Sequence, residues 1–515
     1  MLDNLNWTAA AVFVFFFALV TIVGFVAARW KAGDLDQLHE WGLGGRRFGA
    51  WITWFLLGGD LYTAYTVIAV PGVMYALGAY GFFAVPYTIL IYPLVFLIMP
   101  RLWNVTHKHG HLTGADFIAG RYGNRWLELA VAFTGILATM PYIALQLVGM
   151  EKVIHALGFQ ADGMASHLPL TIAFIILALY TYKSGLRAPA MIAFVKDIMI
   201  YVFVIAAVIV IPAKLGGYGA VFDAAKSAYD AKIAAAVAAG KPAPAIGLTL
   251  APSQIWLFVS LSIGSAMALF MYPHAMTGTL SASSPNVIRR NAVTLPAYSL
   301  VLGLIALLGV MALAAGIDVK DPQQAVPQLV LKMFPDWFAG FCFAAIAIGA
   351  LVPAAVMSIG AANTFTRNVW KPFIEPDMSP MKEAYLAKLM SLIVKVGALV
   401  VILWLPTQFA LDLQLLGGVW MLQIFPAVVG GLYTRWFSGW ALLIGWAAGM
   451  LTGSYLCWGP TALVTAVPIF GTTFYIGLVA VAINAAVSVV LTLILGSSAA
   501  DETAVTDYED AVKAS

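Results

Sequence analysis

The sequence is poor in charged residues for its length. Only 10% of its 515 residues are charged, whereas 62% are hydrophobic. A soluble globular chain carries roughly a quarter charged residues, so this chain cannot cover its apolar surface with polar groups in water. The formal net charge of +3 is also too small to indicate binding to nucleic acid. These shortages exclude an ordinary soluble domain and favour a protein whose solvent is lipid.

Cysteine and catalytic motifs are scarce as well. The two cysteines, Cys342 and Cys457, lie singly inside apolar runs, which gives no case for a disulfide framework or a thiolate metal site. No P-loop, G-x-S-x-G, H-E-x-x-H or C-x-x-C pattern occurs. His107, His109 and His111 lie close together, but their segment offers no matching acid or thiol. We therefore expect no metal, no cofactor and no enzymatic activity.

Apolar runs of about twenty residues, in contrast, recur along almost the whole chain. An α-helix of this length crosses about 30 Å of hydrocarbon, and the ten-residue alternation of a membrane β-barrel does not dominate. The sequence predicts an all-α membrane protein with about thirteen transmembrane helices. The predicted spans are residues 7–28, 49–76, 80–100, 126–150, 168–186, 189–213, 253–278, 293–316, 337–363, 387–405, 407–433, 436–457 and 473–496.

The arginines indicate the orientation of these spans. Every arginine falls on the same side of the predicted membrane, which the positive-inside rule makes cytoplasmic. They are Arg29, Arg46, Arg47, Arg101, Arg121, Arg125, Arg187, Arg289, Arg290, Arg367 and Arg435. We expect a multi-pass protein of the bacterial inner membrane, with its N-terminus outside and its C-terminus cytoplasmic. The first apolar run is too long for the core of a signal peptide and is expected to be retained.

The chain is predicted to form a single polytopic transporter domain over residues 1–500. Residues 501–515 are predicted to form a short acidic cytoplasmic tail. The external loop from about Lys214 to Pro252 is rich in alanine and lysine and yields no prediction of structure.

Two predicted spans carry helix breakers in their middle. The second contains Gly58, Gly59 and Asp60, and the seventh contains Pro273 followed by His274. Irregular backbone inside a membrane is tolerated only where it is buried in protein or lines a cavity. Because the breaks lie five spans apart, they indicate a substrate site at the midplane of an inverted-repeat transporter. The alternative is a packing glycine and an ordinary proline kink.

Several segments resemble the sodium:solute symporter family, and the resemblance runs along nearly the whole chain. Residues 66–71 and 140–147 are most similar to its monocarboxylate and short organic-acid branch. The resemblance implies a LeuT-like fold with a five-plus-five inverted repeat, one helix before the repeats and two after them. The other segments that carry it are residues 113–123, 184–188 and 269–274.

The sequence departs from the family pattern at the sodium site. The resemblance implies that backbone carbonyls of the first broken helix, here Gly59 and Tyr62, bind sodium beside the hydroxyl of Thr63. It also implies two adjacent Ser or Thr side chains on a later helix. The aligned pair here is Val352 and Pro353, which offer no side-chain oxygen. We therefore predict that the sodium site has been lost.

A lysine stands where a replacement for sodium is expected. Lys196, followed by Asp197, lies one helical turn after the position of the family's acidic residue. A lysine in the middle of a membrane helix costs roughly 2.5–3.5 kcal/mol and therefore usually works inside the protein. The sequence resembles, at this position, sodium-independent relatives of the fold, and that resemblance implies a lysine on this helix in the place of the cation. Lys196 is predicted to do so here, with Asp60 or Asp197 as its counter-ion.

Each of these charged residues has a structural alternative. Lys196 and Asp197 could snorkel to an interface or form a purely structural pair. Asp60 could cap the free amides of the broken helix. Lys395 is placed nearer the cytoplasmic end of its span, so we expect it to snorkel.

Polar side chains near the breaks are the candidates for binding substrate. They are Tyr62, Thr63, Tyr142, Gln146, Tyr272 and His274. No arginine lies within a span, so a substrate carboxylate would be held by helix N-termini, hydroxyls, amides or Lys196. His274 is a second protonatable candidate. The alternative for each is a hydrogen bond within the core.

The expected function is secondary active import of short monocarboxylates such as lactate, pyruvate or acetate, with a proton as the favoured coupling ion. One alternative is a sodium-coupled symporter for another organic solute. Another is a channel or a nutrient sensor on the same fold, although a sensor usually needs an output domain larger than the tail. The expected partners are the organic acid, the proton or sodium ion and the lipid bilayer.

Overall fold

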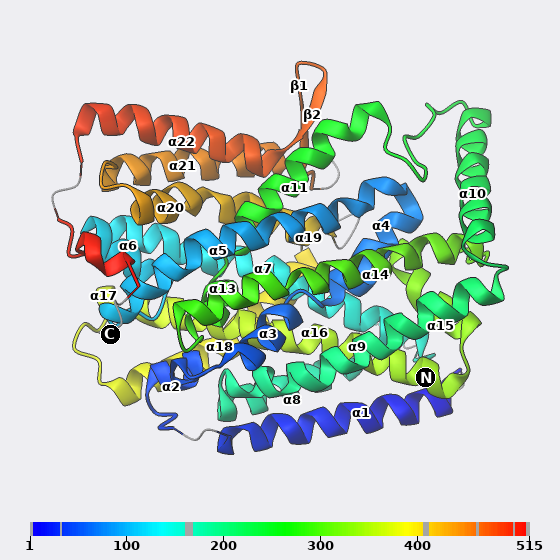
Figure 1. Ribbon diagram of the computed structural model, residues 1–515, viewed down its shortest axis with the longest axis horizontal. Helices are drawn as coiled ribbons and strands as arrows, with labels where there is room; N and C mark the ends of the chain where they lie inside the picture. Colours follow the sequence, from blue (N-terminus) through cyan, green and yellow to red (C-terminus); the bar gives the residue numbers. More distant parts are fainter. Residues whose placement is uncertain are drawn as a thin grey trace.

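The computed structural model describes residues 4–30, 33–159, 168–404, 411–459, 463–497 and 500–510. Its helices lie side by side along the long axis of the molecule (Figure 1). Within these ranges, ten helices are long and apolar enough to cross a membrane, and shorter apolar helices accompany them. The predicted all-α membrane protein is confirmed. The number of membrane crossings stays a prediction.

The first repeat begins with a broken helix, as the glycine pair at residues 58–59 predicts. Glycine lowers helix stability, and Asp60 ends the first half. The second half begins with a π-helical turn. The elements of this repeat are α3 (Ala50–Gly59), η3 (Tyr65–Ala69), α4 (Val70–Leu77), α5 (Ala84–Lys108), α7 (Arg125–Ala156), α8 (Leu168–Ser184) and α9 (Arg187–Lys214).

The second repeat has the same order and also begins with a broken helix. Its elements are α11 (Ile255–Leu269), α12 (Pro273–Leu280), α13 (Pro285–Thr294), α14 (Pro296–Ala314), α16 (Asp336–Phe365), α18 (Pro380–Trp404), α19 (Leu411–Met421) and α20 (Phe425–Tyr433).

One long helix precedes the repeats and two follow them, as predicted. α1 (Trp7–Val26) lies along one edge of the molecule, and α21 (Gly439–Cys457) and α22 (Ile476–Leu495) lie along the opposite edge (Figure 1). A hairpin of β1 (Ala466–Ile469) and β2 (Thr472–Tyr475) connects the last two helices, with Ala466 paired to Tyr475.

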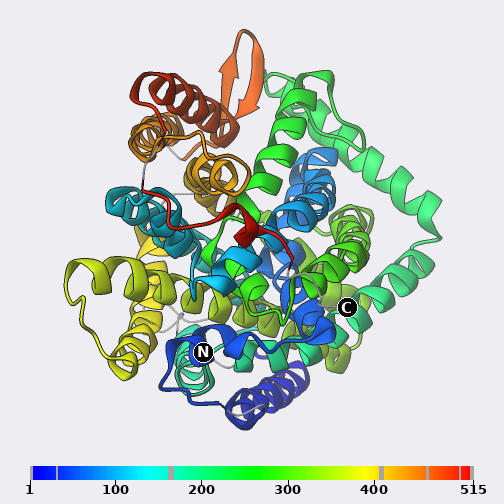
Figure 2. The same ribbon diagram turned by 60° about the vertical axis from the view of Figure 1, so that its left-hand side comes forward.

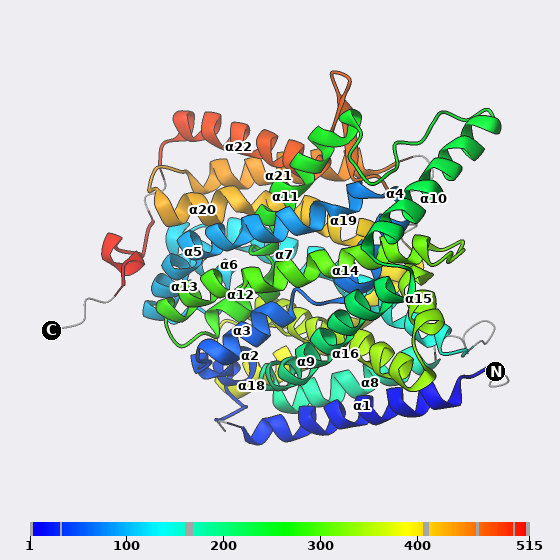
Figure 3. The same cartoon turned by 45° about the vertical axis from the view of Figure 1, so that its right-hand side comes forward.

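Short elements cover the two ends of the molecule. One end carries α2 (Leu38–Leu43), α6 (Gly114–Tyr122), α17 (Lys371–Phe373) and the last described residues, and the other carries α10 (Tyr218–Ala238) and α15 (Ala325–Met333) (Figures 1 and 3). We call the first of these the basic end. The remaining turns are η1 (Ala27–Arg29), η2 (Gly44–Arg46), η4 (Ala79–Phe83), η6 (Pro252–Gln254), η7 (Pro322–Gln324), η8 (Thr366–Trp370), η9 (Leu422–Ile424) and η10 (Val505–Tyr508).

The loop that gave no prediction contains a helix. α10 occupies 21 residues of this segment, and its alanines explain it because alanine has the highest helix propensity. Tyr229 anchors α10 by donating a hydrogen bond from its hydroxyl to the carbonyl of Met74.

α16 forms the centre of the helix packing. Every residue from 342 to 364 is buried. Figure 2 looks more nearly along the helices and shows them on all sides of the centre of the molecule. Small residues make this possible. A Cβ atom at Gly360 would lie only 2.7 Å from the carbonyl carbon of Pro273, so the glycine lets the break before α12 contact α16 directly.

Candidate functional site

The first break is held by side chains that replace helical hydrogen bonds. The Gln146 side chain accepts a hydrogen bond from the Ala64 N–H (3.0 Å) and donates one to the carbonyl of Tyr142 (3.3 Å). The Thr63 hydroxyl accepts from the Tyr65 N–H (3.0 Å). Backbone groups at membrane depth must find partners within the protein. Gln146 and Thr63, both predicted to bind substrate, therefore hold the unwound backbone in this structure.

The second break exposes the beginning of a helix. Residues 270–272 separate α11 from α12, and Pro273 occupies the first position of α12. The N–H groups of His274 and Ala275 fall in the first turn, where an α-helix offers them no intrahelical acceptor. The positive end of the α12 dipole therefore lies beside the break, which favours an anion there.

Residues from the two breaks meet beside Tyr142 of α7 in one group, which we call the central cluster: Asp60, Tyr142, Tyr272 and His274. The ring centroids of Tyr142, Tyr272 and His274 lie 5.2–5.6 Å apart. The Nε2 atom of His274 lies 3.4 Å from Oδ2 of Asp60, whose side chain is only 12% exposed. The fold thus brings together four of the residues that the sequence singled out.

The central cluster and its surroundings contain polar atoms without partners. Among the described residues, none hydrogen-bonds to the hydroxyl of Tyr272, to either ring nitrogen of His274 or to Oδ1 of Asp60. The hydroxyl of Tyr65 is in the same state. A buried polar group without a partner costs about 1–3 kcal/mol and is uncommon in folded proteins. Such a group of donors and acceptors is expected where a polar ligand supplies the missing partners.

The sequence analysis missed Gln414 of α19. Within the described ranges, neither polar atom of its buried amide has a hydrogen-bond partner. Gly417 lies one turn further along the same face, and a Cβ atom there would be 2.4 Å from the hydroxyl oxygen of Tyr272. Gln414 therefore lies on the face of α19 that is turned toward the central cluster. A glutamine in the apolar run 411–421 is the signal that could have found it.

A second polar site lies on the other side of the first break. The Lys196 ammonium of α9 donates to the carbonyl oxygens of Gly59 and Tyr62, the latter at 3.1 Å. It lies 3.3 Å from Oδ1 of Asp197, and the hydroxyl of Tyr298 donates to Oδ2 of Asp197 (2.7 Å). Lys196 and Asp197 are completely buried. We call Lys196, Asp197 and Tyr298 the lysine site.

The lysine site uses the two carbonyls that the family resemblance assigns to sodium. Gly59 leaves room for the ammonium, because a Cβ atom there would lie 3.1 Å from Nζ of Lys196. α16 faces the same place, since a Cβ atom at Gly349 would lie 3.5 Å from the Tyr62 carbonyl oxygen. Val352 and Pro353 are buried one turn further along α16.

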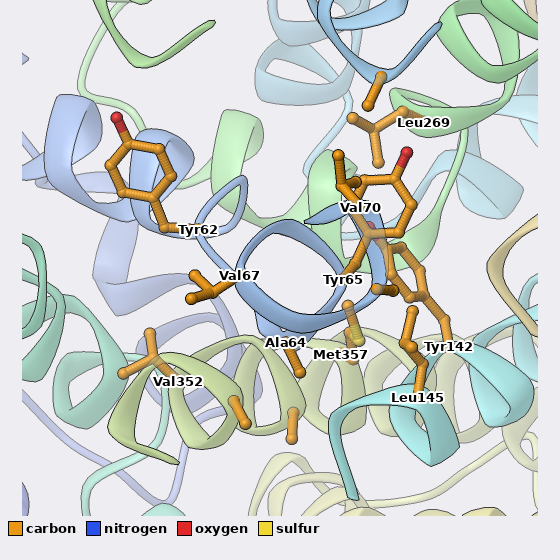
Figure 4. Packing of buried hydrophobic residues seen from close by; sticks show 14 of the residues in the cluster. Tyr62, Ala64, Tyr65, Val67, Val70, Tyr142, Leu145, Leu269, Val352 and Met357 are labelled. Carbon is orange, nitrogen blue, oxygen red and sulfur yellow. The ribbon is translucent and has the colours of Figure 1, made fainter. Parts of the chain in front are cut away.

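Three expectations need correction or refinement. Asp60 contacts His274, whereas Asp197 is the carboxylate that contacts Lys196. Tyr62 points away from Tyr65 and Tyr142 (Figure 4) and donates to the carbonyl of Tyr298 (3.2 Å), so its side chain belongs to the lysine side. The expectation that Lys395 snorkels is wrong. It is 3% exposed in the middle of α18 and donates to the carbonyl of Ser391 in the preceding turn (3.2 Å).

Comparison with known proteins identifies the family. Residues 41–435 match the model of the sodium:solute symporter family. The chain belongs to this family. It is 56% identical over 506 residues to a protein of Rhizobium johnstonii named monocarboxylate transport permease, a match that covers 97% of this chain and 99% of that protein. An uncharacterized Bacillus subtilis symporter, YodF, is 34% identical, with 86% of this chain and 87% of that protein covered.

More distant relatives share the fold of this symporter-family chain. A sodium/proline symporter of Staphylococcus aureus is 23% identical over 88% of this chain and 85% of that protein. The solved structure of a Na⁺-coupled sialic acid symporter superposes with a TM-score of 0.73 at 14% identity, covering 95% of this chain and 99% of the other. The LeuT-like transporter fold expected from the resemblance is confirmed.

Proposed function

We propose that this chain carries short monocarboxylates such as lactate, pyruvate or acetate across the bacterial inner membrane by alternating access. The observation that carries this proposal is the 56% identity, over nearly the full length of both chains, to the monocarboxylate transport permease. The arginines support an orientation with the basic end in the cytoplasm. This orientation places the N-terminus outside.

The central cluster suits a small carboxylate. The carboxylate oxygens of such a substrate accept hydrogen bonds. The hydroxyls of Tyr65 and Tyr272 and the amide of Gln414 are donors that lack acceptors among the described residues. The first turn of α12 adds free backbone N–H groups and the positive end of a helix dipole. These groups hold the substrate anion without an arginine. Bonds to a charged carboxylate are about twice as strong as neutral ones.

Asp60 links substrate binding to a proton. A substrate carboxylate beside the Asp60 carboxylate places two like charges close together in a site of low dielectric constant, which is unfavourable. A proton bound by either Asp60 or His274, whose Oδ2 and Nε2 atoms lie 3.4 Å apart, removes this repulsion. Proton and substrate then favour each other's binding. Equilibrium coupling of this kind is reciprocal.

The lysine site supports the same coupling ion. A sodium ion needs the carbonyl oxygens of Gly59 and Tyr62 as ligands, but the Lys196 ammonium already donates to both. We infer that Lys196 stabilises the first break in place of the sodium ion that the family resemblance implies there. Loss of its proton would remove the charge that Asp197 and the two carbonyls hold, and so loosen the break.

Sodium coupling is the second candidate, favoured by relatives that are named sodium/proline symporters. Uptake of labelled lactate or pyruvate into proteoliposomes separates the two. Proton coupling predicts accumulation under an imposed pH gradient in sodium-free buffer. Accumulation driven by a sodium gradient alone would overturn it. Saturable counterflow of labelled against unlabelled acid would exclude a channel, and the Asp60→Asn variant should retain counterflow while losing accumulation driven by the pH gradient.

A further inference from the structure

The last described residues form an ordered strap across the basic end. In its first half, Asp501 contacts Arg121 of α6 (3.0 Å) and Arg435, which follows α20 (3.4 Å). Arg435 also donates to the carbonyl of Thr503 (2.6 Å), and the Glu502 N–H donates to the carbonyl of Gly120 (2.9 Å). The first half is therefore attached to α6 and to the end of α20.

The second half of the strap is attached to different helices. Asp507 pairs with Lys108 and His109 at the end of α5, the latter at 2.7 Å. Asp510 accepts hydrogen bonds from Asn104 of α5 (3.0 Å) and from Arg289 of α13 (2.7 and 3.1 Å). This half therefore connects α5 of the first repeat to α13 of the second repeat.

An aromatic residue in the second half of the strap anchors it to both α5 and α6. Tyr508 is only 5% exposed, and its ring contacts Phe117 of α6 and the guanidinium of Arg101 of α5. Its hydroxyl shares a hydrogen bond with Thr503 (2.7 Å). A buried tyrosine with a satisfied hydroxyl is typical of a specific contact. The strap is thus docked by apolar burial as well as by charge.

A closed passage lies between the central cluster and the basic end. A cavity of about 20 Å³, enough for roughly one water molecule, extends from Met271 and Pro273 to Leu112 and Thr113, with Thr277 and Thr364 in its wall. In inverted-repeat transporters, access alternates when one group of helices rocks against another. The walls of this passage come from α12 on one side and from α6, α7 and α19 on the other, so widening it requires α12 to move away from them. We infer that α13, which directly follows α12 and packs against α5, moves with α12.

We propose that residues 501–510 form a latch that holds the basic end closed, with a basic surface made of Lys108, Arg121, Arg289 and Arg435 as its docking site. The strap crosses from α6 and α20 to α5 and α13, so it must release when these elements separate. Lys108, Arg435, Arg289 and Asp510 are at least 30% exposed, so their pairs are individually weak and screened by salt, whereas Arg121 and Asp507 are buried partners that position the strap. A latch of this kind can open and close in each transport cycle. The inference rests on the proposed alternating access and orientation.

Labelling of a cysteine in the closed passage tests the latch. The reporter is Thr277→Cys in a Cys342→Ala/Cys457→Ser background, exposed to a membrane-impermeant maleimide at the basic end of the purified, reconstituted protein. The triple variant Asp501→Asn/Asp507→Asn/Asp510→Asn should label at least roughly threefold faster. The parent should label faster at high ionic strength than at low, whereas the triple variant should lose this dependence.

The control is Glu509→Gln, which removes one negative charge from the same segment at an exposed position. Equal labelling rates of the triple variant and this control would overturn the proposal. A second reporter, Ala345→Cys in the buried centre of α16, should stay unlabelled if the fold is intact. If Ala345→Cys becomes labelled, a charge swap distinguishes release of the strap from loss of the fold. Asp510→Arg and Arg289→Asp should each accelerate Thr277→Cys labelling, and together should restore the slow rate; failure to restore it refutes the latch.

This test needs no transported substrate. Failure to accumulate lactate or pyruvate in proteoliposomes would overturn the proposed substrate class, but the labelling result could still be interpreted. Unchanged labelling with intact lactate transport would overturn the latch alone.

Discussion

Replacing Lys196 with alanine removes the ammonium that joins the first broken helix to α9. The carbonyls of Gly59 and Tyr62 lose this donor, and Asp197 keeps the hydrogen bond from Tyr298. Breaking a buried ion pair by removing one partner costs about 3–5 kcal/mol, because the remaining charge stays buried without compensation. At 1.4 kcal/mol per tenfold, the population with a correctly formed break should fall by more than roughly a hundredfold.

The position that the Lys196 ammonium leaves empty in this variant leads to a sharper prediction. Without the ammonium, two carbonyl oxygens and the Asp197 carboxylate form a group of oxygen ligands, which hard cations prefer. Lys196→Ala should therefore be stabilised by sodium but not by choline. A sodium concentration one hundred times its dissociation constant would return about 2.7 kcal/mol. The parent protein should show no such difference.

Two assays check these expectations. Thermal unfolding of the purified protein in sodium or choline chloride measures the stability change, and uptake of labelled lactate under a pH gradient measures coupling. Lys395→Met is the matched control, because Lys395 is also a buried lysine but donates to a carbonyl of its own helix. It should lose stability without gaining a response to sodium. If Lys196→Ala accumulates lactate with the pH dependence of the parent, the lysine is structural and the reasoning is refuted.

Three further predictions each concern a single residue. Tyr298→Phe removes the hydroxyl that donates to Asp197, at a cost of about 1.5–3 kcal/mol for a bond to a charged group, and should shift the pH profile of uptake more than the KM. Gln414→Leu removes a donor beside the central cluster and should raise the KM for lactate about tenfold, with little change in thermal stability; an unchanged KM would remove Gln414 from the substrate site. At the strap, burial alone would raise the pKa of Asp507, but hydrogen bonds from Lys108, the Ala504 N–H and His109 hold that pKa well below its usual range. The strap should therefore stay docked from pH 8 down to about pH 4 and loosen only at lower pH, which the mobility of a spin label at Glu509→Cys measures.

The sign of the last prediction follows from the direction of the shift. A carboxylate whose pKa is lower in the docked state stabilises docking fully above its unperturbed pKa of about 3.9. That contribution is lost as the pH falls through the lower value. Release of the label between pH 8 and pH 5 would therefore contradict the role given to Asp507.

The broad architecture of the chain was predictable because its physical causes are local. An apolar run of twenty residues can only span lipid, and glycine or proline in such a run breaks the helix wherever it packs. Lys196 was predictable for the same reason, since a lysine in the middle of an apolar span usually faces the protein interior. The helix α10 was missed because an alanine-rich segment carries no amphipathic pattern to set it apart from a loop.

The tertiary structure alone decided which polar groups face each other. Tyr62 and Tyr65 are three residues apart, yet the unwound backbone turns one toward the lysine site and the other toward the central cluster (Figure 4). Gln146 and Gln414 are the same residue type in apolar helices. Gln146 accepts from the Ala64 N–H of the break and donates to a carbonyl of its own helix, whereas Gln414 has no partner among the described residues. Asp60 contacts His274, which lies more than two hundred positions along the chain.

By itself, the sequence determined that the chain lies in a membrane, where its helices break and that a buried lysine stands near the family's sodium position. Those features depend on composition and spacing along one helix. The partners of Asp60 and Lys196, the direction in which Gln414 faces, and the docking of the strap on α5 and α13 depend on the rotation of each helix about its axis. That rotation is set by packing across the whole molecule, including glycines such as Gly59 and Gly360 that let backbone and side chains meet.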